Sequence, residues 1–181
     1  MSKKVAFLDR DGTINVDHGY VNKVEDWEFV PGATQGMKLL QEAGFTLAVV
    51  TNQSGIAQGL YTEADMDKLH GHMKRLLSED GVEIAHVASC PHARDQDDCD
   101  CRKPKAGMAK QIEAAIGPID YAASWIIGDK EADVGFGKNA GTHTALLESD
   151  YWQADTLKDK PDLIAPSLFD AAQMIISANG L

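Results

Sequence analysis

The stretch Val5-Ala6-Phe7-Leu8-Asp9-Arg10-Asp11-Gly12-Thr13 decides the fold, because it joins a buried strand to a polar turn. The apolar run over residues 5–8 predicts a strand that is covered on both faces, as in a parallel sheet. Gly12 lets the chain turn sharply directly after this strand. Open α/β sheets bind their ligands at the carboxyl ends of the strands, so Asp9 and Asp11 are predicted to lie at such a site.

Asp9 and Asp11 stand two residues apart, and carboxylates so close repel each other unless a positive charge lies beside them. A divalent cation meets this need, and Mg²⁺ favours oxygen ligands in open sites that also admit phosphate oxygens. A calcium-binding loop would need glutamate at its twelfth position, which is Tyr20 when counted from Asp9. Two solvated turn aspartates are the alternative at this point, since aspartate is common in turns.

Strands and helices alternate along the rest of the chain, which predicts a doubly wound parallel sheet with helices on both faces. Turn residues and helix-capping residues mark where each predicted strand or helix begins and ends. The predicted strands are 5–8, 45–50, 82–89, 124–127, 144–147 and 163–164, and the predicted helices are 33–43, 62–78, 106–116, one ending at Gly141 and one from Leu168 to Gly180. No linker divides the sequence, so we expect a single α/β domain over residues 1–181.

The composition favours a globular protein with a small-molecule partner. The 181 residues are 44% hydrophobic, which suits a core of ordinary size. The formal net charge of −11 repels the phosphates of nucleic acids. The sequence contains no run of about eighteen apolar residues, so we expect no membrane span. The first residues, Met1-Ser2-Lys3-Lys4, lack the apolar core of a signal peptide. We therefore expect a cytoplasmic monomer without a nucleic-acid or membrane partner.

Other predicted strand ends also carry polar side chains. Thr51 and Asn52 follow the strand 45–50, and Asp129 follows the strand 124–127. The cations Arg102 and Lys103 precede a helix and are expected on the same side of the sheet. Such a constellation at the edge where ligands bind indicates a phosphoryl-transfer site.

The chemistry of phosphoryl transfer suggests a role for each acid. The charge on the equatorial oxygens must be stabilised while the attacking and leaving groups are held in line. We expect Asp9 to attack phosphorus and form an aspartyl-phosphate. Asp11 would protonate the leaving alkoxide and then deprotonate the hydrolytic water. Asp129 would hold Mg²⁺ together with Asp9, since the metal neutralises the repulsion between carboxylates and phosphate.

The remaining candidates are expected to bind the substrate. Thr51 and Lys103 would contact the oxygens of the transferring phosphoryl group. Asn52 can donate and accept hydrogen bonds to neighbouring hydroxyl groups. Arg102 can make bidentate contacts with a second phosphate or with sugar hydroxyls.

A second metal site is predicted from the cysteines. Cys90, His92, Cys99 and Cys101 form a three-cysteine, one-histidine set that takes up every cysteine of the chain. Four protein ligands with no open position are typical of structural zinc, and three unrelated buried thiols are the alternative. Cys101 adjoins Arg102 and Lys103, so the zinc-bound loop would aim both cations at the phosphate.

The motifs resemble, in their order along the chain, the four signatures of the haloacid dehalogenase-like phosphatases. The first signature is Asp9-Arg10-Asp11-Gly12-Thr13, and Gly128-Asp129 resembles the fourth. The resemblance implies a Rossmann-like core and adds the backbone carbonyl of Asp11 as a third Mg²⁺ ligand. The second acid of the fourth signature is not in its usual place, because Lys130 follows Asp129. The short gaps after the first and second signatures leave no room for a separate cap domain.

The zinc loop narrows the resemblance to the histidinol-phosphatase-related subfamily. The stretches at 7–15, 16–21, 51–57 and 128–130 resemble its branch that removes the 7-phosphate of heptose 1,7-bisphosphate. That branch serves the biosynthesis of nucleotide-activated heptose for lipopolysaccharide core or S-layer glycans. The six residues between His92 and Cys99 are closer to the branch that acts on histidinol phosphate, which stays the alternative. A non-catalytic zinc-stabilised binding protein and a polynucleotide phosphatase are further alternatives.

Some polar residues keep an open role at this point. His18 and Tyr20 could touch substrate or belong to a surface loop. Lys130 has no assigned role, and Asp133 could support the metal through water. His70 flanks the apolar face of the predicted helix 62–78, and we expect it to be solvated.

Overall fold

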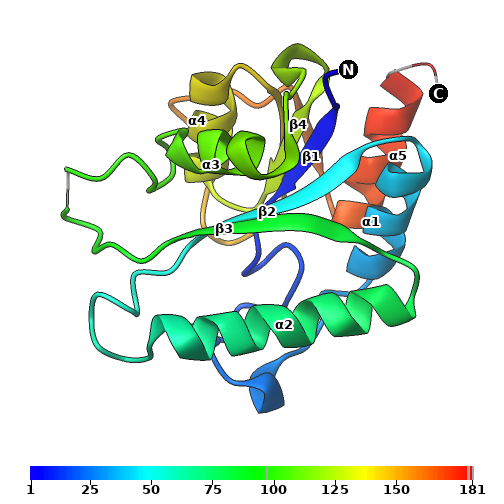
Figure 1. The fold of residues 1–181 in the computed structure, drawn as a ribbon. Helices are drawn as coiled ribbons and strands as arrows, with labels where there is room; N and C mark the ends of the chain where they lie inside the picture. Colours follow the sequence, from blue (N-terminus) through cyan, green and yellow to red (C-terminus); the bar gives the residue numbers. More distant parts are fainter. Residues whose placement is uncertain (97, 179, 181) are drawn as a thin grey trace.

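The computed structural model describes residues 1–96, 98–178 and 180, which form a parallel sheet between two layers of helices (Figure 1). The elements are β1 (Val5–Leu8), η1 (Val24–Asp26), α1 (Ala33–Glu42), β2 (Thr46–Asn52), α2 (Glu63–Glu79), β3 (Ile84–Cys90), α3 (Gly107–Ile116), η2 (Tyr121–Ala123), β4 (Trp125–Gly128), α4 (Glu131–Ala140), β5 (His143–Leu147), β6 (Leu163–Ala165) and α5 (Leu168–Ala178).

The strands lie in the order β3-β2-β1-β4-β5-β6, and every neighbouring pair is parallel. The first strand is therefore central, and the chain winds outward from it in both directions. Ligands of such sheets bind where the winding direction changes, at the carboxyl ends of the strands. In this sheet that point lies between β1 and β4, directly beside Asp9.

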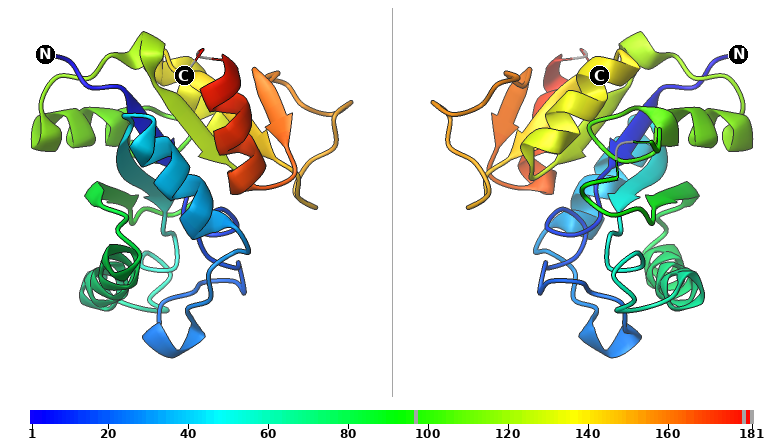
Figure 2. Two further views of the ribbon diagram at one scale, coloured as in Figure 1. Left: turned by 90° about the vertical axis from the view of Figure 1, so that its right-hand side faces the viewer. Right: turned by 90° about the vertical axis from the view of Figure 1, so that its left-hand side faces the viewer.

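The alternation of side chains along β1 divides the core into two clusters. Ala6 and Leu8 pack with α1, α5 and the buried face of α2, whereas Val5 and Phe7 pack with α3 and α4. Helices α1 and α5 also pack against each other (Figure 2). All four residues of β1 are buried, as expected for a strand with both faces covered. The packing fixes the direction in which β1 delivers Asp9.

The predicted fold class is confirmed. Each predicted strand and helix is present, and the short helices η1 and η2 are the elements that the sequence did not indicate. The last helix ends at Ala178 rather than Gly180. Within the described residues, the segments between the first two strands and between β2 and α3 contain loops, η1, α1, α2 and β3, with no cap domain among them. The prediction that residues 1–181 are a single domain extends over positions 97, 179 and 181, which lie outside the described residues.

No helix in the described part of the chain is both long enough and apolar enough to cross a membrane.

Candidate active site

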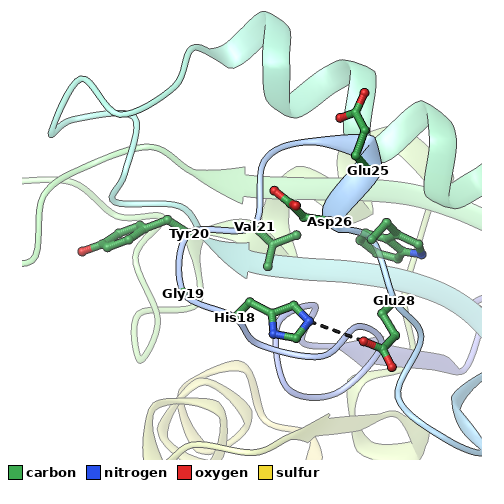
Figure 3. A pocket seen from close by; sticks show the side chains of 8 residues that line it. His18, Gly19, Tyr20, Val21, Glu25, Asp26 and Glu28 are labelled. Carbon is green, nitrogen blue, oxygen red and sulfur yellow. Dashed lines mark ion pairs between the residues drawn. The ribbon is translucent and has the colours of Figure 1, made fainter.

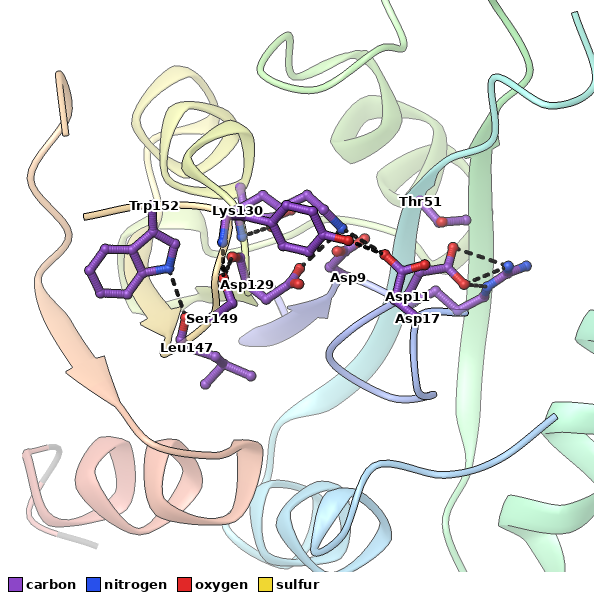
Figure 4. Close-up of polar contacts among 12 residues, drawn as sticks. Asp9, Asp11, Asp17, Thr51, Asp129, Lys130, Leu147, Ser149 and Trp152 are labelled. Carbon is purple, nitrogen blue, oxygen red and sulfur yellow. Dashed lines mark hydrogen bonds and ion pairs between the residues drawn. The ribbon is translucent and has the colours of Figure 1, made fainter. Parts of the chain in front are cut away.

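Asp9 leaves β1 in a turn that contacts the loop after β4. Its backbone N–H donates to the carbonyl of Ile127 on β4 (3.0 Å), and the residue is 5% exposed. Gly12 has a φ of 85°, and a Cβ added there would lie 2.2 Å from Oδ2 of Asp129. Glycine is therefore required at position 12 both for the backbone conformation and for the approach of Asp129. Figure 4 shows Asp9, Asp11 and Asp129 around this turn.

The Lys103 ammonium group lies between two carboxylates inside the protein. Its Nζ donates to Oδ1 of Asp9 (2.7 Å), to Oδ1 of Asp133 (2.7 Å) and to the carbonyl of Val50 (2.8 Å). Burial opposes the charge, but Asp133 and Asp9 outweigh it and hold the pKa of Lys103 above its usual value. A lysine with this pKa is a fixed positive charge at neutral pH, which suits it to bind phosphoryl oxygens.

The carboxylate of Asp9 is also kept charged. Its burial opposes ionisation, but Lys103 and then Lys130 outweigh this effect and hold the pKa of Asp9 below its usual value. Asp9 is thus an ionised carboxylate at the end of a buried strand, which suits it to act as an oxygen nucleophile.

Asp133, left open by the sequence, lies inside the site on the first turn of α4. Its Oδ1 pairs with Lys103, and its Oδ2 accepts the backbone N–H of Lys130 (3.1 Å). A Cβ on Gly128 would lie 2.2 Å from Oδ2 of Asp133, so the glycine makes room for this acid. Both oxygens of Asp133 are engaged, which makes it an anchor for Lys103. The sequence signal for this role is the four-residue spacing from Asp129, one turn of helix.

The donors around Asp129 fit a divalent cation. This residue is 2% exposed, and its Oδ1 has no hydrogen-bond partner among the described residues. Burial, followed by the charge of Asp9, raises the pKa of Asp129 to about 8 although Lys130 lies nearby, so its ionised form needs further positive charge at neutral pH. Oxygen atoms of Asp9, Asp129 and Asp133 lie within 4.8 Å of one another. Carboxylate oxygens are the ligands that Mg²⁺ prefers.

Asp11 is held by three side chains that the sequence did not single out. Nη2 of Arg10 donates to both carboxylate oxygens (2.8 and 3.0 Å). Nδ2 of Asn15 donates to Oδ1 (3.0 Å), and Nε2 of Gln53 donates to Oδ2 (2.9 Å). These three donors are almost completely buried, whereas 18% of the Asp11 side chain is exposed. The carboxylate is therefore fixed on one side and open toward the cavity on the other.

Thr51 and Asn52 lie at the end of β2, as predicted. The Thr51 hydroxyl accepts a hydrogen bond from Nε2 of Gln53 (2.7 Å), so one glutamine connects Thr51 with Asp11. The amide of Asn52 bonds both backbone groups of Lys103: its Oδ1 accepts the N–H (3.0 Å), and its Nδ2 donates to the carbonyl (3.2 Å). Asn52 thus fixes the backbone that carries Lys103, in addition to lining the cavity.

Lys130 connects the site with the loop that follows β5. Its Nζ lies 3.5 Å from Oδ1 of Asp129, 3.4 Å from Oδ2 of Asp17 and 4.4 Å from the centre of the Tyr151 ring. The Tyr151 hydroxyl donates to Oδ2 of Asp17 (3.0 Å), and Ser149 donates to the carbonyl of Asp129 (2.6 Å). Figure 4 shows Lys130 and Ser149 beside Asp129, and Asp17 beside Asp11. These contacts form one rim of the cavity.

A cavity of about 420 Å³ opens beside these groups. Its lining includes Asp11, Lys103 and Lys130 together with two arginines, Arg94 and Arg102, from the loop after β3. This volume suits a small, highly charged molecule. Tyr20, whose role the sequence left open, lies on its wall.

A second hollow, of about 520 Å³, is lined by residues of the segment 18–28, which lies between β1 and α1 (Figure 3). Its wall contains Glu25, Asp26 and Glu28, and His18 pairs with Glu28 at 3.5 Å. The acidic side chains repel a phosphate, so this hollow does not suit the chemistry of the first cavity. His18 lines this hollow rather than the cavity beside Asp11.

The cysteine set predicted from the sequence is assembled at the start of the loop after β3. Ligand atoms of Cys90, His92, Cys99 and Cys101 lie within 4.8 Å of one another, and the three thiols are free and buried. Nδ1 of His92 lies 3.1 Å from Sγ of Cys101 and 3.4 Å from Sγ of Cys90. This clustering and donor set fit a four-coordinate zinc ion.

The comparisons with known proteins agree with this geometry. A family profile described as HAD-hydrolase-like matches residues 100–171. The chain is 43% identical over 178 residues to the D-glycero-beta-D-manno-heptose-1,7-bisphosphate 7-phosphatase of Haemophilus ducreyi, and the alignment covers 94% of this chain and 97% of that relative. This chain belongs to the heptose-1,7-bisphosphate 7-phosphatase family.

Two further members of the heptose bisphosphate phosphatase family extend the comparison. The protein of that name from Escherichia coli K12 is 43% identical over 155 residues, which are 81% of each chain. The crystal structure of D,D-heptose 1.7-bisphosphate phosphatase from B. bronchiseptica, complexed with magnesium and phosphate, superimposes with a TM-score of 0.85. It is 30% identical and covers 97% of this chain and 99% of its own. The predicted resemblance to haloacid dehalogenase-like phosphatases is thereby confirmed.

Proposed function

We propose that this protein is a Mg²⁺-dependent phosphatase that removes the 7-phosphate of D-glycero-D-manno-heptose 1,7-bisphosphate. The observation that carries the proposal is the arrangement at the end of β1, where Nζ of Lys103 lies 2.7 Å from Asp9 and the carboxylate oxygens of Asp9 and Asp129 lie within 4.8 Å of each other. The relatives named above supply the substrate.

In this mechanism Asp9 attacks phosphorus and Asp11 serves both half-reactions. The ionised Asp9 forms the aspartyl-phosphate while Asp11 protonates the leaving alkoxide, which is a poor leaving group on a primary carbon. Asp11 then takes a proton from the water that hydrolyses the intermediate. Lys103 and the Thr51 hydroxyl bind the phosphoryl oxygens on which negative charge accumulates.

Mg²⁺ would be held by Asp9, Asp129 and the backbone carbonyl of Asp11. When bound, the metal neutralises negative charge on the phosphoryl oxygens and on the carboxylates. Asp133 is assigned to Lys103 rather than to the metal, since the Lys103 ammonium and the Lys130 N–H each contact one of its oxygens. Its part is to keep Lys103 charged and in place.

The second phosphate of the substrate needs its own cation, and Arg102 is our candidate. Arg102 lines the cavity next to Lys103 and can bind a phosphate through two nitrogens. We expect Arg102→Ala to lower kcat/KM for the heptose bisphosphate by about 10–100-fold, the scale of losing one charge-assisted pair. We expect a smaller loss with p-nitrophenyl phosphate, which has no second phosphate.

The control for this experiment is Arg75→Ala, which removes an exposed arginine that pairs with Glu79 on α2, away from the cavity. It should change neither substrate's kcat/KM. Equal losses with both substrates in Arg102→Ala would reject the assignment of Arg102 to the second phosphate.

We also propose that the cysteine set holds one structural Zn²⁺ per chain. Cys101 directly precedes Arg102 and Lys103, and the Lys105 ammonium donates to the carbonyl of Cys99 (2.7 Å), so the metal would brace the segment that carries both cations. Cys99→Ala should lose the metal, lower the melting temperature and reduce activity. Elemental analysis of the purified wild type and variant tests this, and wild-type protein without bound zinc would contradict it.

Substrate choice is tested by comparing kcat/KM for heptose 1,7-bisphosphate and for histidinol phosphate. The cavity is lined by Arg94, Arg102 and Lys130, which favour a second anionic group over the amine and imidazole of histidinol phosphate. We expect the heptose bisphosphate to be the better substrate. Preference for histidinol phosphate would replace the proposal with the alternative, and the absence of phosphate release from either would favour a binding protein.

The wider setting follows from the same proposal. The reaction would serve the biosynthesis of nucleotide-activated heptose for lipopolysaccharide core or S-layer glycans. We propose that residues 1–181 act as one phosphatase domain, in a cytoplasmic monomer with no nucleic-acid or membrane partner. The net charge of −11 supports the exclusion of nucleic acid.

A further inference from the structure

His70 is buried, contrary to the expectation from the sequence, and it faces a charged group. It lies on α2 and is 7% exposed. Its Nε2 lies 3.2 Å from Nη1 of Arg10. An arginine can only donate hydrogen bonds, so Nε2 must be the acceptor and the ring proton must be on Nδ1. Burial and the charge of Arg10 lower the pKa of His70 to about 3, which keeps the ring neutral.

Arg10 is a completely buried guanidinium whose donors point in several directions. Besides Nε2 of His70, its Nη1 contacts the sulfur of Met66 (2.7 Å). Nη2 donates to the carbonyl of Val21 (2.7 Å), and Nε and Nη2 reach the carboxylate of Asp11 at 3.2, 2.8 and 3.0 Å. One edge of the guanidinium therefore binds the catalytic acid, while the remaining contacts attach it to α2 and to the loop after β1.

The orientation of Asp11 depends on this attachment. The planar guanidinium makes contacts with both oxygens of Asp11, so a rotation of Arg10 would rotate the carboxylate as well. Nη1 of Arg10 contacts the His70 ring on the side of the guanidinium that faces away from Asp11. His70 belongs to α2, which carries none of the proposed reacting groups.

We propose that His70 is a positioning residue of the phosphatase: it fixes the Arg10 guanidinium and through it aims the Asp11 carboxyl at the leaving-group oxygen. The inference rests on the proposed role of Asp11 as general acid. In the first half-reaction the bond between Asp9 and phosphorus forms as the bond from phosphorus to the leaving oxygen breaks. The electron pair of that bond stays on the leaving oxygen, which takes the proton of Asp11.

The leaving group supplies a readout that a general loss of structure would not produce. A sugar alkoxide depends on the proton of Asp11, whereas the phenolate of p-nitrophenyl phosphate leaves without one. For an enzyme with a covalent intermediate, kcat/KM reports the steps up to the first release of product. A misdirected Asp11 should therefore lower kcat/KM for the alkyl phosphate and leave kcat/KM for the aryl phosphate nearly unchanged.

The experiment compares His70→Leu, His70→Gln and the control His72→Leu in the full-length protein. Leucine cannot accept from Arg10, whereas the amide oxygen of glutamine can. His72 is on the same helix, half-buried and beside Arg75 rather than Arg10. With heptose 1,7-bisphosphate we expect kcat/KM to fall about 10–100-fold in His70→Leu, the scale of a small displacement of a catalytic group. With p-nitrophenyl phosphate the fall should be less than about threefold by the same argument.

The other variants complete the test. His70→Gln should recover most of the lost activity, and His72→Leu should match wild type with both substrates. Equal losses with both substrates in His70→Leu, or no recovery in His70→Gln while the melting temperature stays near wild type, would overturn the positioning role. If His70→Leu does not fold, His70→Ala takes its place, because alanine also cannot accept from Arg10, and the same comparison of the two substrates decides.

A failure of the proposed substrate would look different. Wild-type protein would then not release phosphate from the heptose bisphosphate. The comparison of leaving groups would be made instead with histidinol phosphate, itself a primary alkyl phosphate, and the same selective loss in His70→Leu would support the positioning role.

Discussion

Asp9→Asn is expected to abolish turnover, because it removes the proposed nucleophile and a proposed metal ligand with one substitution. The amide nitrogen of asparagine is not a nucleophile toward phosphorus, and its neutral side chain no longer attracts Mg²⁺. We expect kcat to fall by on the order of 10⁵-fold or more, as for other enzymes that lose a covalent nucleophile. Phosphate release from the heptose bisphosphate, measured with purified variant at saturating Mg²⁺, checks this.

The matched control for Asp9→Asn is Asp67→Asn, the same substitution at an exposed position of α2. It should keep wild-type activity. If Asp9→Asn turns over substrate at a rate near that of wild type and of Asp67→Asn, the covalent mechanism is wrong.

Lys103→Met is the second substitution with a large expected effect, and it should reduce both activity and stability. The ammonium group is 2.7 Å from both Asp9 and Asp133, so its removal leaves two buried carboxylates without their cation. Removing one partner of a buried ion pair costs about 3–5 kcal/mol of unfolding free energy. Loss of a preorganised charge at the phosphoryl oxygens lowers kcat by about 10²–10³-fold. Urea denaturation and steady-state kinetics measure the two effects.

Lys110→Met provides the comparison, because it removes the same charge from an exposed position of α3. Its unfolding free energy should change by less than about 0.5 kcal/mol, as is usual for surface substitutions. If Lys103→Met has an unfolding free energy no lower than that of Lys110→Met, the buried pairing of Lys103 with the two acids does not stabilise the fold.

The sequence predicted the fold and the residues at the strand ends because both depend on local patterns. The apolar run of β1, followed by Asp9 and Gly12, identifies a central strand of a parallel sheet and its loop. Because all the strands are parallel, residues that follow different strands meet at one edge. Asp129, Thr51 and Lys103 could therefore be assigned to one site before any contact was known.

The supporting residues could not be predicted, because their contacts join segments that have no pattern in common. Gln53 connects Thr51 with Asp11, and Arg10 reaches Met66 and His70 across more than fifty positions. His70 was wrongly expected to be solvated, because helical periodicity places it at the edge of the apolar face. The buried Arg10 lies against this face of the helix. Helical periodicity carries no signal of such a contact, because Arg10 belongs to a distant segment of the chain.

The most direct test of the central claim is a ³¹P NMR record of heptose 1,7-bisphosphate during incubation with the enzyme and Mg²⁺. If the protein is a 7-phosphatase, the resonance of the 7-phosphate disappears and inorganic phosphate grows in equal amount. The resonance of the phosphate on carbon 1 should persist, and chelation of Mg²⁺ should stop the reaction. Loss of the phosphate on carbon 1, or an unchanged spectrum with folded, Mg²⁺-loaded protein, would contradict the proposed activity.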